Sequence, residues 1–186
     1  MYDNTISLRC TKEPKFEHVS LEAAKNHARV DIDDDDALLT SMIAAARKAA
    51  EGRLHRVLRE SIWEWKVRNS EKSTLEIPVS PCFACQSVSV DGDELDSAGF
   101  SFVPSGPGGL SSPLYASLNG LPAAGITTVT VRAGYPKDGC PQEIIQWMLV
   151  KITGLYEQRE AFVTGGSLHE FGRGFVDHLL DPYILP

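Results

Sequence analysis

The chain has 186 residues, of which 18 are Lys or Arg and 25 are Asp or Glu, so its formal net charge is −7. This length fits one domain, or one domain with an inserted subdomain, and excludes two independent catalytic domains. With 42% hydrophobic and 23% charged residues, the chain is neither a disordered tail nor a fibrous repeat, and its acidic balance argues against a surface that grips nucleic-acid phosphates.

Two helices are predicted in the first third of the chain, after a turn-like lead that contains Pro14. Ser20 can cap a short helix from Leu21 to about Ala28. After the acidic run 31–36, apolar residues at helical spacing predict a long helix from about Ala37 to Leu58. The aspartates place negative charge at the positive end of this helix dipole, and Arg53, His55, Arg56 and Arg59 place basic groups near its carboxyl end.

Short strands are predicted in the middle of the chain. Residues 62–68 alternate between apolar and polar in the period-2 manner of a half-buried strand. Asp91-Gly92, after residues 87–90, suits a type I′ hairpin turn. The remaining predicted strands are 74–77, 100–103 and 127–132, with a loop rich in Gly, Ser and Pro at 104–113. Together these segments predict a small antiparallel sheet.

A second long helix is predicted from Pro141 to about Arg159, and its apolar residues surround most of the helix circumference. Such a helix is expected to be buried on several sides, inside the domain or against another subunit. A glycine-rich stretch, 164–174, and an apolar segment, 175–186, follow. We expect a chain truncated after Gly166 to remain folded.

This order of elements predicts an α+β protein. A helical body, with two N-terminal helices and one long and one short C-terminal helix, carries an inserted small antiparallel β-sheet. We assign residues 1–186 to a single protomer. Its parts are the N-terminal helices in 18–60, the β subdomain in 61–135, the long core helix in 140–161 and a flexible C-terminal arm in 162–186.

The motifs that carry chemistry are weak. Cys82 and Cys85 have CxxC spacing, but a zinc site needs two more ligands, and Cys10 and Cys140 belong to no second pair. We interpret all four as reduced thiols; a small CxxC metal or redox module stays open as an alternative. The acidic run at 31–36 lacks the Gly and Glu of a calcium loop.

No hydrolase, zincin, Walker or Rossmann fingerprint occurs, and the five histidines are dispersed. We therefore expect no catalytic residue, no cofactor-binding residue, no metal ligand and no cofactor. A hydrolase that uses a histidine with an acidic partner is a weaker alternative. No apolar run approaches the ~18 residues of a membrane span and no secretory signal is visible, so we expect no membrane contact and synthesis in the cytoplasm.

Several segments, taken in their order and spacing, resemble the head-tail connector, or adaptor, proteins of long-tailed bacteriophages, prophages and gene transfer agents. The matching segments are Val19–Val30, Asp34–Leu39, Ile43–Arg47, Glu51–Arg53, Trp63, Leu75–Pro78, Val88–Gly92, Ala133–Tyr135, the Pro141 helix with Tyr156–Glu160, and Leu180–Tyr183. The stretch Gly99–Pro122 departs from the family pattern.

The resemblance implies a non-enzymatic virion protein that forms a ring, usually a dodecamer, beneath the portal at the head-tail junction. The ring would extend the DNA channel, let DNA pass without specific binding, and offer a docking surface for tail or head-completion proteins. A tail terminator or head-closure protein is an alternative that shares the ring. The chain would be made in the cytoplasm of the bacterial host.

In such proteins the C-terminal segment tends to engage the portal, which corresponds here to about Phe171–Pro186. The expected portal-interface residues are Phe171, Phe175, Leu179, Leu180, Tyr183, Ile184 and Leu185. The expected inter-subunit packing residues are Ile144, Trp147, Met148 and Tyr156. We expect truncation after Gly166 to abolish joining to the portal.

Overall fold

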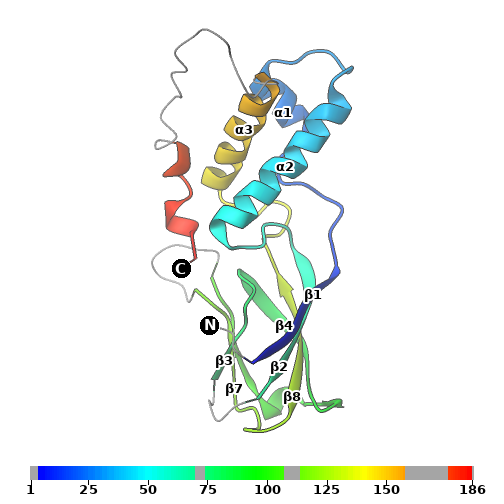
Figure 1. The fold of residues 1–186 in the computed structure, drawn as a ribbon, viewed down its shortest axis with the longest axis vertical. Helices are drawn as coiled ribbons and strands as arrows, with labels where there is room; N and C mark the ends of the chain where they lie inside the picture. Colours follow the sequence, from blue (N-terminus) through cyan, green and yellow to red (C-terminus); the bar gives the residue numbers. More distant parts are fainter. Residues whose placement is uncertain (1–3, 70–73, 107–113, 158–175, 186) are drawn as a thin grey trace. The chain divides into compact units, whose positions relative to one another are not determined.

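The computed structural model of the chain describes residues 4–69, 74–106, 114–157 and 176–185 (Figure 1). It divides into two compact units, each built from two separate segments of the chain. The sheet unit comprises residues 1–16 and 56–136, and the helical unit comprises residues 17–55 and 137–186. The mixed α and β content is confirmed, with three α-helices and antiparallel sheets among the described residues.

Among the described residues of the sheet unit, eight strands form two antiparallel sheets. The five-stranded sheet has the order β1 (Thr5–Lys12), β2 (Ser61–Arg68), β8 (Ile126–Ala133), β4 (Cys82–Val90), β5 (Asp93–Glu94). The three-stranded sheet has the order β3 (Thr74–Glu76), β7 (Ser117–Asn119), β6 (Ser101–Val103). The stretch 99–122, which the family pattern does not cover, thus supplies two of the three strands of the smaller sheet.

The strand β1 is absent from the sequence prediction, which treats the residues before Ser20 as a turn-like lead. Its residues do alternate between polar and apolar from Thr5 to Thr11, so the period-2 signal of a strand is present there, although Ile6 and Leu8 remain exposed in the structure. The strand is held by pairing with β2, including Leu8 opposite Trp65. Which strand β1 pairs with, 50 or more residues away, is a tertiary contact that local sequence does not encode.

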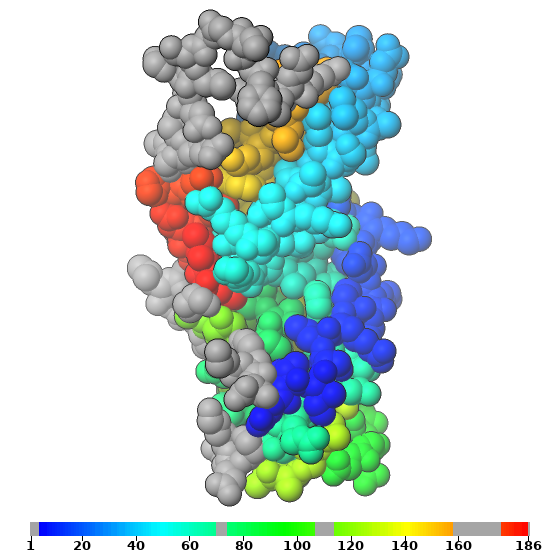
Figure 2. Space-filling model, viewed as in Figure 1, coloured from blue at the N-terminus to red at the C-terminus, as the bar shows by residue number. Residues whose placement is uncertain are grey.

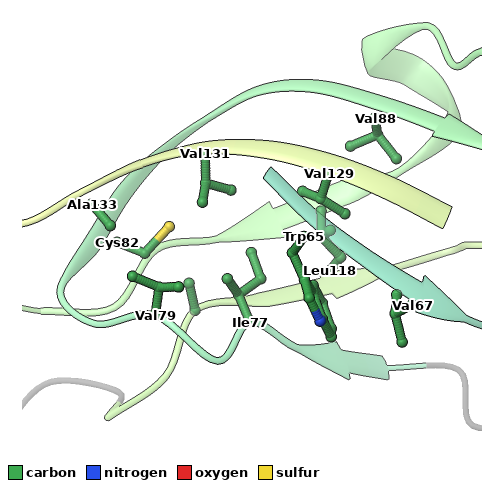
Figure 3. Close-up of a cluster of buried hydrophobic side chains, with 11 residues drawn as sticks. Trp65, Val67, Ile77, Val79, Cys82, Val88, Leu118, Val129, Val131 and Ala133 are labelled. Atoms are coloured by element: carbon green, nitrogen blue, oxygen red, sulfur yellow. The ribbon is translucent and has the colours of Figure 1, made fainter. Parts of the chain in front are cut away.

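The core of the sheet unit lies between the two sheets. On β8, Thr127, Val129, Val131 and Ala133 are buried at every second position, as one face of a strand requires. Eleven buried side chains form this cluster (Figure 3), namely Trp65, Val67, Ile77, Val79, Cys82, Val88, Ala116, Leu118, Val129, Val131 and Ala133. Because both sheets contribute, neither is stable as a single exposed layer.

Positive φ occurs in the sheet unit at the turn after β4 and directly after β8, among other positions. Asp91 and Gly92 have φ of 52° and 99°, so the predicted type I′ hairpin between β4 and β5 is confirmed. The Asp91 carboxylate also accepts a hydrogen bond from the Ile126 N–H at 2.9 Å. Gly134 has φ of 98° directly after β8, where the chain runs against Arg59 and Glu60.

The helical unit contains α1 (Leu21–Ala28), α2 (Asp36–Leu54), α3 (Gln142–Glu157) and a short 3-10 helix, η2 (Asp181–Tyr183). The predicted cap is confirmed, since the Ser20 hydroxyl accepts a hydrogen bond from the Ala23 N–H at 3.1 Å. The helix α2 ends at Leu54, four residues before the predicted end, because His55 adopts the left-handed conformation with φ of 53°.

The early end of α2 corrects the predicted charge pattern. Arg53 lies in the last turn, as expected, but Arg56 and Arg59 follow the helix and belong to the sheet unit. Arg56 is buried there and donates a hydrogen bond to the Ser80 hydroxyl at 3.0 Å. It therefore serves the packing of the sheet unit and does not balance the dipole of α2.

Candidate interaction surfaces

Residues 176–185 pack on the helices of the helical unit (Figure 2, in red). Leu180 and Leu185 are buried, at 0% and 3% exposure. The backbone N–H of Leu185 donates to the carbonyl oxygen of Leu54, at the end of α2, at 3.0 Å. We call these ten residues the C-terminal segment.

Asp177 connects this segment to two helices. Its Oδ1 accepts a hydrogen bond from the Trp147 indole of α3 at 2.9 Å. Its Oδ2 lies 3.1 Å from the Arg53 guanidinium in the last turn of α2. A single carboxylate thus joins α2, α3 and the C-terminal segment through two charge-assisted contacts.

Tyr183 provides a second polar contact, because its hydroxyl donates to the Glu143 carboxylate at 3.0 Å. Burial raises the pKa of the Tyr183 phenol, and the bond to Glu143 raises it further, so the phenol remains a donor at neutral pH. The expected portal-interface residues are thus divided. Leu180 and Leu185 face the helical unit, while Leu179 and Tyr183 are half-buried and Ile184 is exposed at 37%.

Phe171 and Phe175, the other two expected portal-interface residues, lie outside the described residues. Contact of any of the seven with a portal stays a prediction. Of those described, Leu179, Tyr183 and Ile184 are the ones with surface available to another protein.

The expected inter-subunit packing residues lie on one face of α3 that is turned into the helical unit. Ile144, Trp147 and Met148 are buried there, together with Ile152. Tyr156 is half-buried and donates a hydrogen bond to the Asp35 carboxylate at 2.6 Å. Their observed packing is within one chain, and contact with a second copy stays a prediction.

Leu155 lies on the same face of α3 as Ile144 and Met148, but near the C-terminal end of the helix, and it is 46% exposed. In the loop between α1 and α2, Ile32 is 56% exposed. Both are apolar side chains of the helical unit that are exposed within the single chain.

The two outer strands of the five-stranded sheet carry opposite charge, which the sequence analysis did not identify. Arg9 and Lys12 lie on β1, and Lys15 follows it; we call these three residues the basic edge. Asp93 and Glu94 form β5, and Asp96 follows it; we call these three the acidic edge. The clustering of acids at 91–96 was visible in the sequence, but their position at an outer strand was not.

The four cysteines do not gather into a metal site. Cys82 and Cys85 lie within β4 instead of at a helix start, and burial raises their pKa to about 12 and about 11. Burial also raises the pKa of Cys140 to about 12, and that of Cys10 is raised as well. Within the described ranges, no three His, Cys, Asp or Glu side chains are placed to hold a metal ion.

We expect the thiols to react unequally with iodoacetamide at pH 8. A thiol whose pKa lies far above 8 carries almost no thiolate, so Cys82, Cys85 and Cys140 should react slowly and the less buried Cys10 fastest. Mass spectrometry of peptides after timed labelling gives the four rates, and labelling in urea supplies the unprotected reference. Faster labelling of Cys82 or Cys85 than of Cys10 would support a redox module instead.

Across the described part of the chain, no helix is long and apolar enough to cross a membrane.

Residues 18–92 match the family model described as "Phage gp6-like head-tail connector protein". The predicted resemblance to head-tail connector proteins is therefore confirmed over this range. The range covers α1, α2 and the strands β2, β3 and β4, and it ends in the turn between β4 and β5, so β1 lies outside it. No curated protein matches the chain.

Six chains of solved structures match the fold. One, from "Neck of empty GTA particle computed with C6 symmetry", has 20% sequence identity and a TM-score of 0.73. A second, from "Virion of native gene transfer agent (GTA) particle", has 18% identity and a TM-score of 0.74. A third, from "Neck of native GTA particle computed with C12 symmetry", has 18% identity and a TM-score of 0.62. In each case the match covers 97% of this chain and 96% of the other, so almost the whole fold is shared.

Proposed function

We propose, from the match of residues 18–92 to the head-tail connector family, that this protein is a structural component of the neck of a phage-like particle. It forms a ring between the portal and the tail, at the head-tail junction of the virion. The observation that carries the proposal is the shared fold, over 97% of the chain, with proteins of gene transfer agent necks. The role is structural, without catalysis.

A ring is the architecture that this role requires. A rotationally symmetric ring needs two different surfaces on each protomer, one for each neighbour. The neck structures that share this fold were computed with C6 and C12 symmetry. A ring of twelve copies of this chain is therefore the assembly we propose.

The charge distribution suits a ring through which DNA passes. The helical unit contains 9 basic and 15 acidic residues, whereas the sheet unit contains 9 and 10. Nearly all of the net charge of −7 thus belongs to the helical unit. Repeated around a ring, negative charge of this kind repels the DNA backbone and so favours passage over retention.

The C-terminal segment is the proposed portal-binding surface. Ile184 is exposed, and Leu179 and Tyr183 are half-buried, so these side chains can enter an apolar site on the portal without unfolding the helical unit. The buried Leu180 and Leu185 hold the segment in place from the other side. Docking a segment that is already ordered costs less entropy than ordering a free arm.

The purified chain is expected to bind portal-containing heads, and Ile184→Asp is expected to weaken that binding at least about tenfold, because it places a charge in an apolar contact. Ile32→Asp is the matched control, since Ile32 is an exposed isoleucine of the same unit outside the C-terminal segment. Co-sedimentation of tagged protein with heads measures binding, and electron microscopy locates the tag.

A tag found at the neck, with binding lost in Ile184→Asp and kept in Ile32→Asp, supports the portal-binding surface. If the tag is found at the neck and both variants bind normally, the connector role stands, but the C-terminal segment is not the portal-binding surface. Protein that is absent from particles, or located elsewhere on them, overturns the connector role. A tag at the tail side of the neck would favour the tail terminator.

A further inference from the structure

The two outer strands of the five-stranded sheet remain unpaired on their outer sides. In the strand order β1-β2-β8-β4-β5, no further strand of the described chain pairs with β1 or β5. Strands lie about 4.8 Å apart, so a sheet of five places its outer strands roughly 19 Å from each other. The two edges therefore lie on opposite sides of the sheet. The free backbone groups and charges of β1 cannot pair with those of β5 within one chain.

Five of the six charged groups on these edges form no ion pair among the residues that the structure describes. Lys12 and Lys15 are exposed and form no ion pair among the residues the structure describes. The same is true of Asp93 and Glu94, while the Asp96 carboxylate accepts a hydrogen bond from the neighbouring Ser97 hydroxyl. Arg9 pairs with Glu64 of β2 at 2.8 Å, yet its side chain is 65% exposed and retains donors for a further contact.

Apolar surface accompanies the charge on the basic edge. Ile6 and Leu8 of β1 are exposed at 50% and 39%. In Figure 2, β1, drawn in blue, lies at the molecular surface. An outer strand with exposed aliphatic side chains is a surface that folded proteins normally cover or protect.

Protection of sheet edges against aggregation is a possible role for charges of any sign. Charges of the same sign on both edges would serve it best, because copies would then repel each other edge to edge. In this chain the two edges carry charges of opposite sign. The acidic edge of one copy is therefore attracted to the basic edge of another. Attraction between two different surfaces is head-to-tail, and head-to-tail contacts close into rings when the rotation between copies permits.

We propose that the acidic edge of one copy of this chain lies against the basic edge of the next copy. The proposal rests on the ring role proposed above and assigns the two surfaces that such a ring needs. Asp93, Glu94 and Asp96 face Arg9, Lys12 and Lys15 of the neighbour, and Ile6 and Leu8 are covered at the same contact.

Charge reversal tests the pairing on the full chain. One variant, Lys12→Glu/Lys15→Glu, makes the basic edge acidic; another, Asp93→Lys/Glu94→Lys/Asp96→Lys, makes the acidic edge basic. Arg9 and Asp91 are left intact because they bond to Glu64 and to the Ile126 N–H within the sheet unit. Lys48→Glu/Lys137→Glu is the matched control, since it changes two exposed lysines of the helical unit.

Each edge variant alone is expected to self-associate at least about tenfold more weakly than the natural chain, since like charges then meet at the contact. An equal mixture of the two edge variants is expected to regain association, because each then offers the edge that the other lacks. Sedimentation velocity over a range of protein concentrations, at low and high salt, measures the strength of self-association. Salt should weaken the association of the natural chain.

Restored association in the mixture, with the control unchanged, supports the pairing. Edge variants that associate like the natural chain overturn it, as does a natural chain that stays monomeric at the highest soluble concentration and low salt. Circular dichroism of each variant identifies loss of folding. The particle experiment above uses whole particles, so the connector role can stand when the edge pairing fails.

Discussion

Truncation after Gly166 is expected to destabilise the helical unit by roughly 3–6 kcal/mol, chiefly because Leu180 and Leu185 are lost from its core. The truncated chain also loses the Asp177 carboxylate that joins Arg53 to Trp147. A typical domain has only about 5–15 kcal/mol in total, so the remaining helices should unfold at a much lower temperature. Thermal unfolding followed by circular dichroism at helix wavelengths measures the loss.

The sequence alone led to the expectation that this truncation leaves a folded protomer. The contacts of the C-terminal segment argue for a different result, and they change how failure to bind a portal must be interpreted. A truncated chain that no longer joins the portal can have lost its portal contact or its fold. The single substitution Ile184→Asp separates the two.

A matched pair of substitutions isolates the buried side of the segment. Leu180→Ala should cost about 2–5 kcal/mol, because it leaves a cavity at a fully buried position. Ile184→Ala should cost less than about 1 kcal/mol, because that side chain keeps contact with solvent. Equal effects of the two, or a truncated chain that melts like the full one, would show that the segment does not stabilise the helical unit.

The second large effect is expected at Gly134, in the sheet unit. A Cβ added there would lie 2.2 Å from the Arg59 carbonyl oxygen and 2.8 Å from the Glu60 nitrogen, and the residue has φ of +98°. Backbone atoms cannot move aside as a flexible side chain can. We therefore expect Gly134→Ala to destabilise the sheet unit by about 2–5 kcal/mol, from left-handed strain and overpacking together.

Gly52→Ala is the control for this prediction. Gly52 lies in α2 with nothing within 4 Å of an added Cβ, so alanine should stabilise the helical unit by up to about 1 kcal/mol. Urea unfolding followed by far-ultraviolet circular dichroism and by tryptophan fluorescence gives both values. A Gly134→Ala chain as stable as the natural one would mean that the turn at 134 can relax away from Arg59.

Local sequence patterns were sufficient to predict the elements that depend on interactions between residues close in sequence. The Ser20 cap, the Asp91-Gly92 hairpin and the long helices each depend on residues within a few positions of one another. The end of α2 was misplaced because the apolar pattern continues to Leu58, while the helix stops where His55 turns left-handed. The strand β1 was missed although residues 5–11 alternate between polar and apolar, because they were interpreted as a turn-like lead; only its pairing with β2 lies beyond local sequence.

The interaction surfaces were less predictable than the fold, for a physical reason. Sequence patterns report that a side chain is apolar, but not which surface covers it. Ile144, Trp147 and Met148 are expected between subunits; within one chain they are buried in the helical unit, and their contact with a second copy stays a prediction. The opposite charges of the two sheet edges become visible only when the strand order is known.

The helical unit is assembled from two stretches of chain that are made at different times. During translation, α1 and α2 leave the ribosome early, but Trp147, Met148 and Leu180, which complete the same unit, follow only after the whole of 56–136. At roughly 5–20 residues per second, the apolar face of α2 waits several seconds for its cover. The sheet unit can complete its hydrogen-bonded strands in that interval. Nascent chains thus present a helical unit that stays unfinished until α3 and the C-terminal segment have been made.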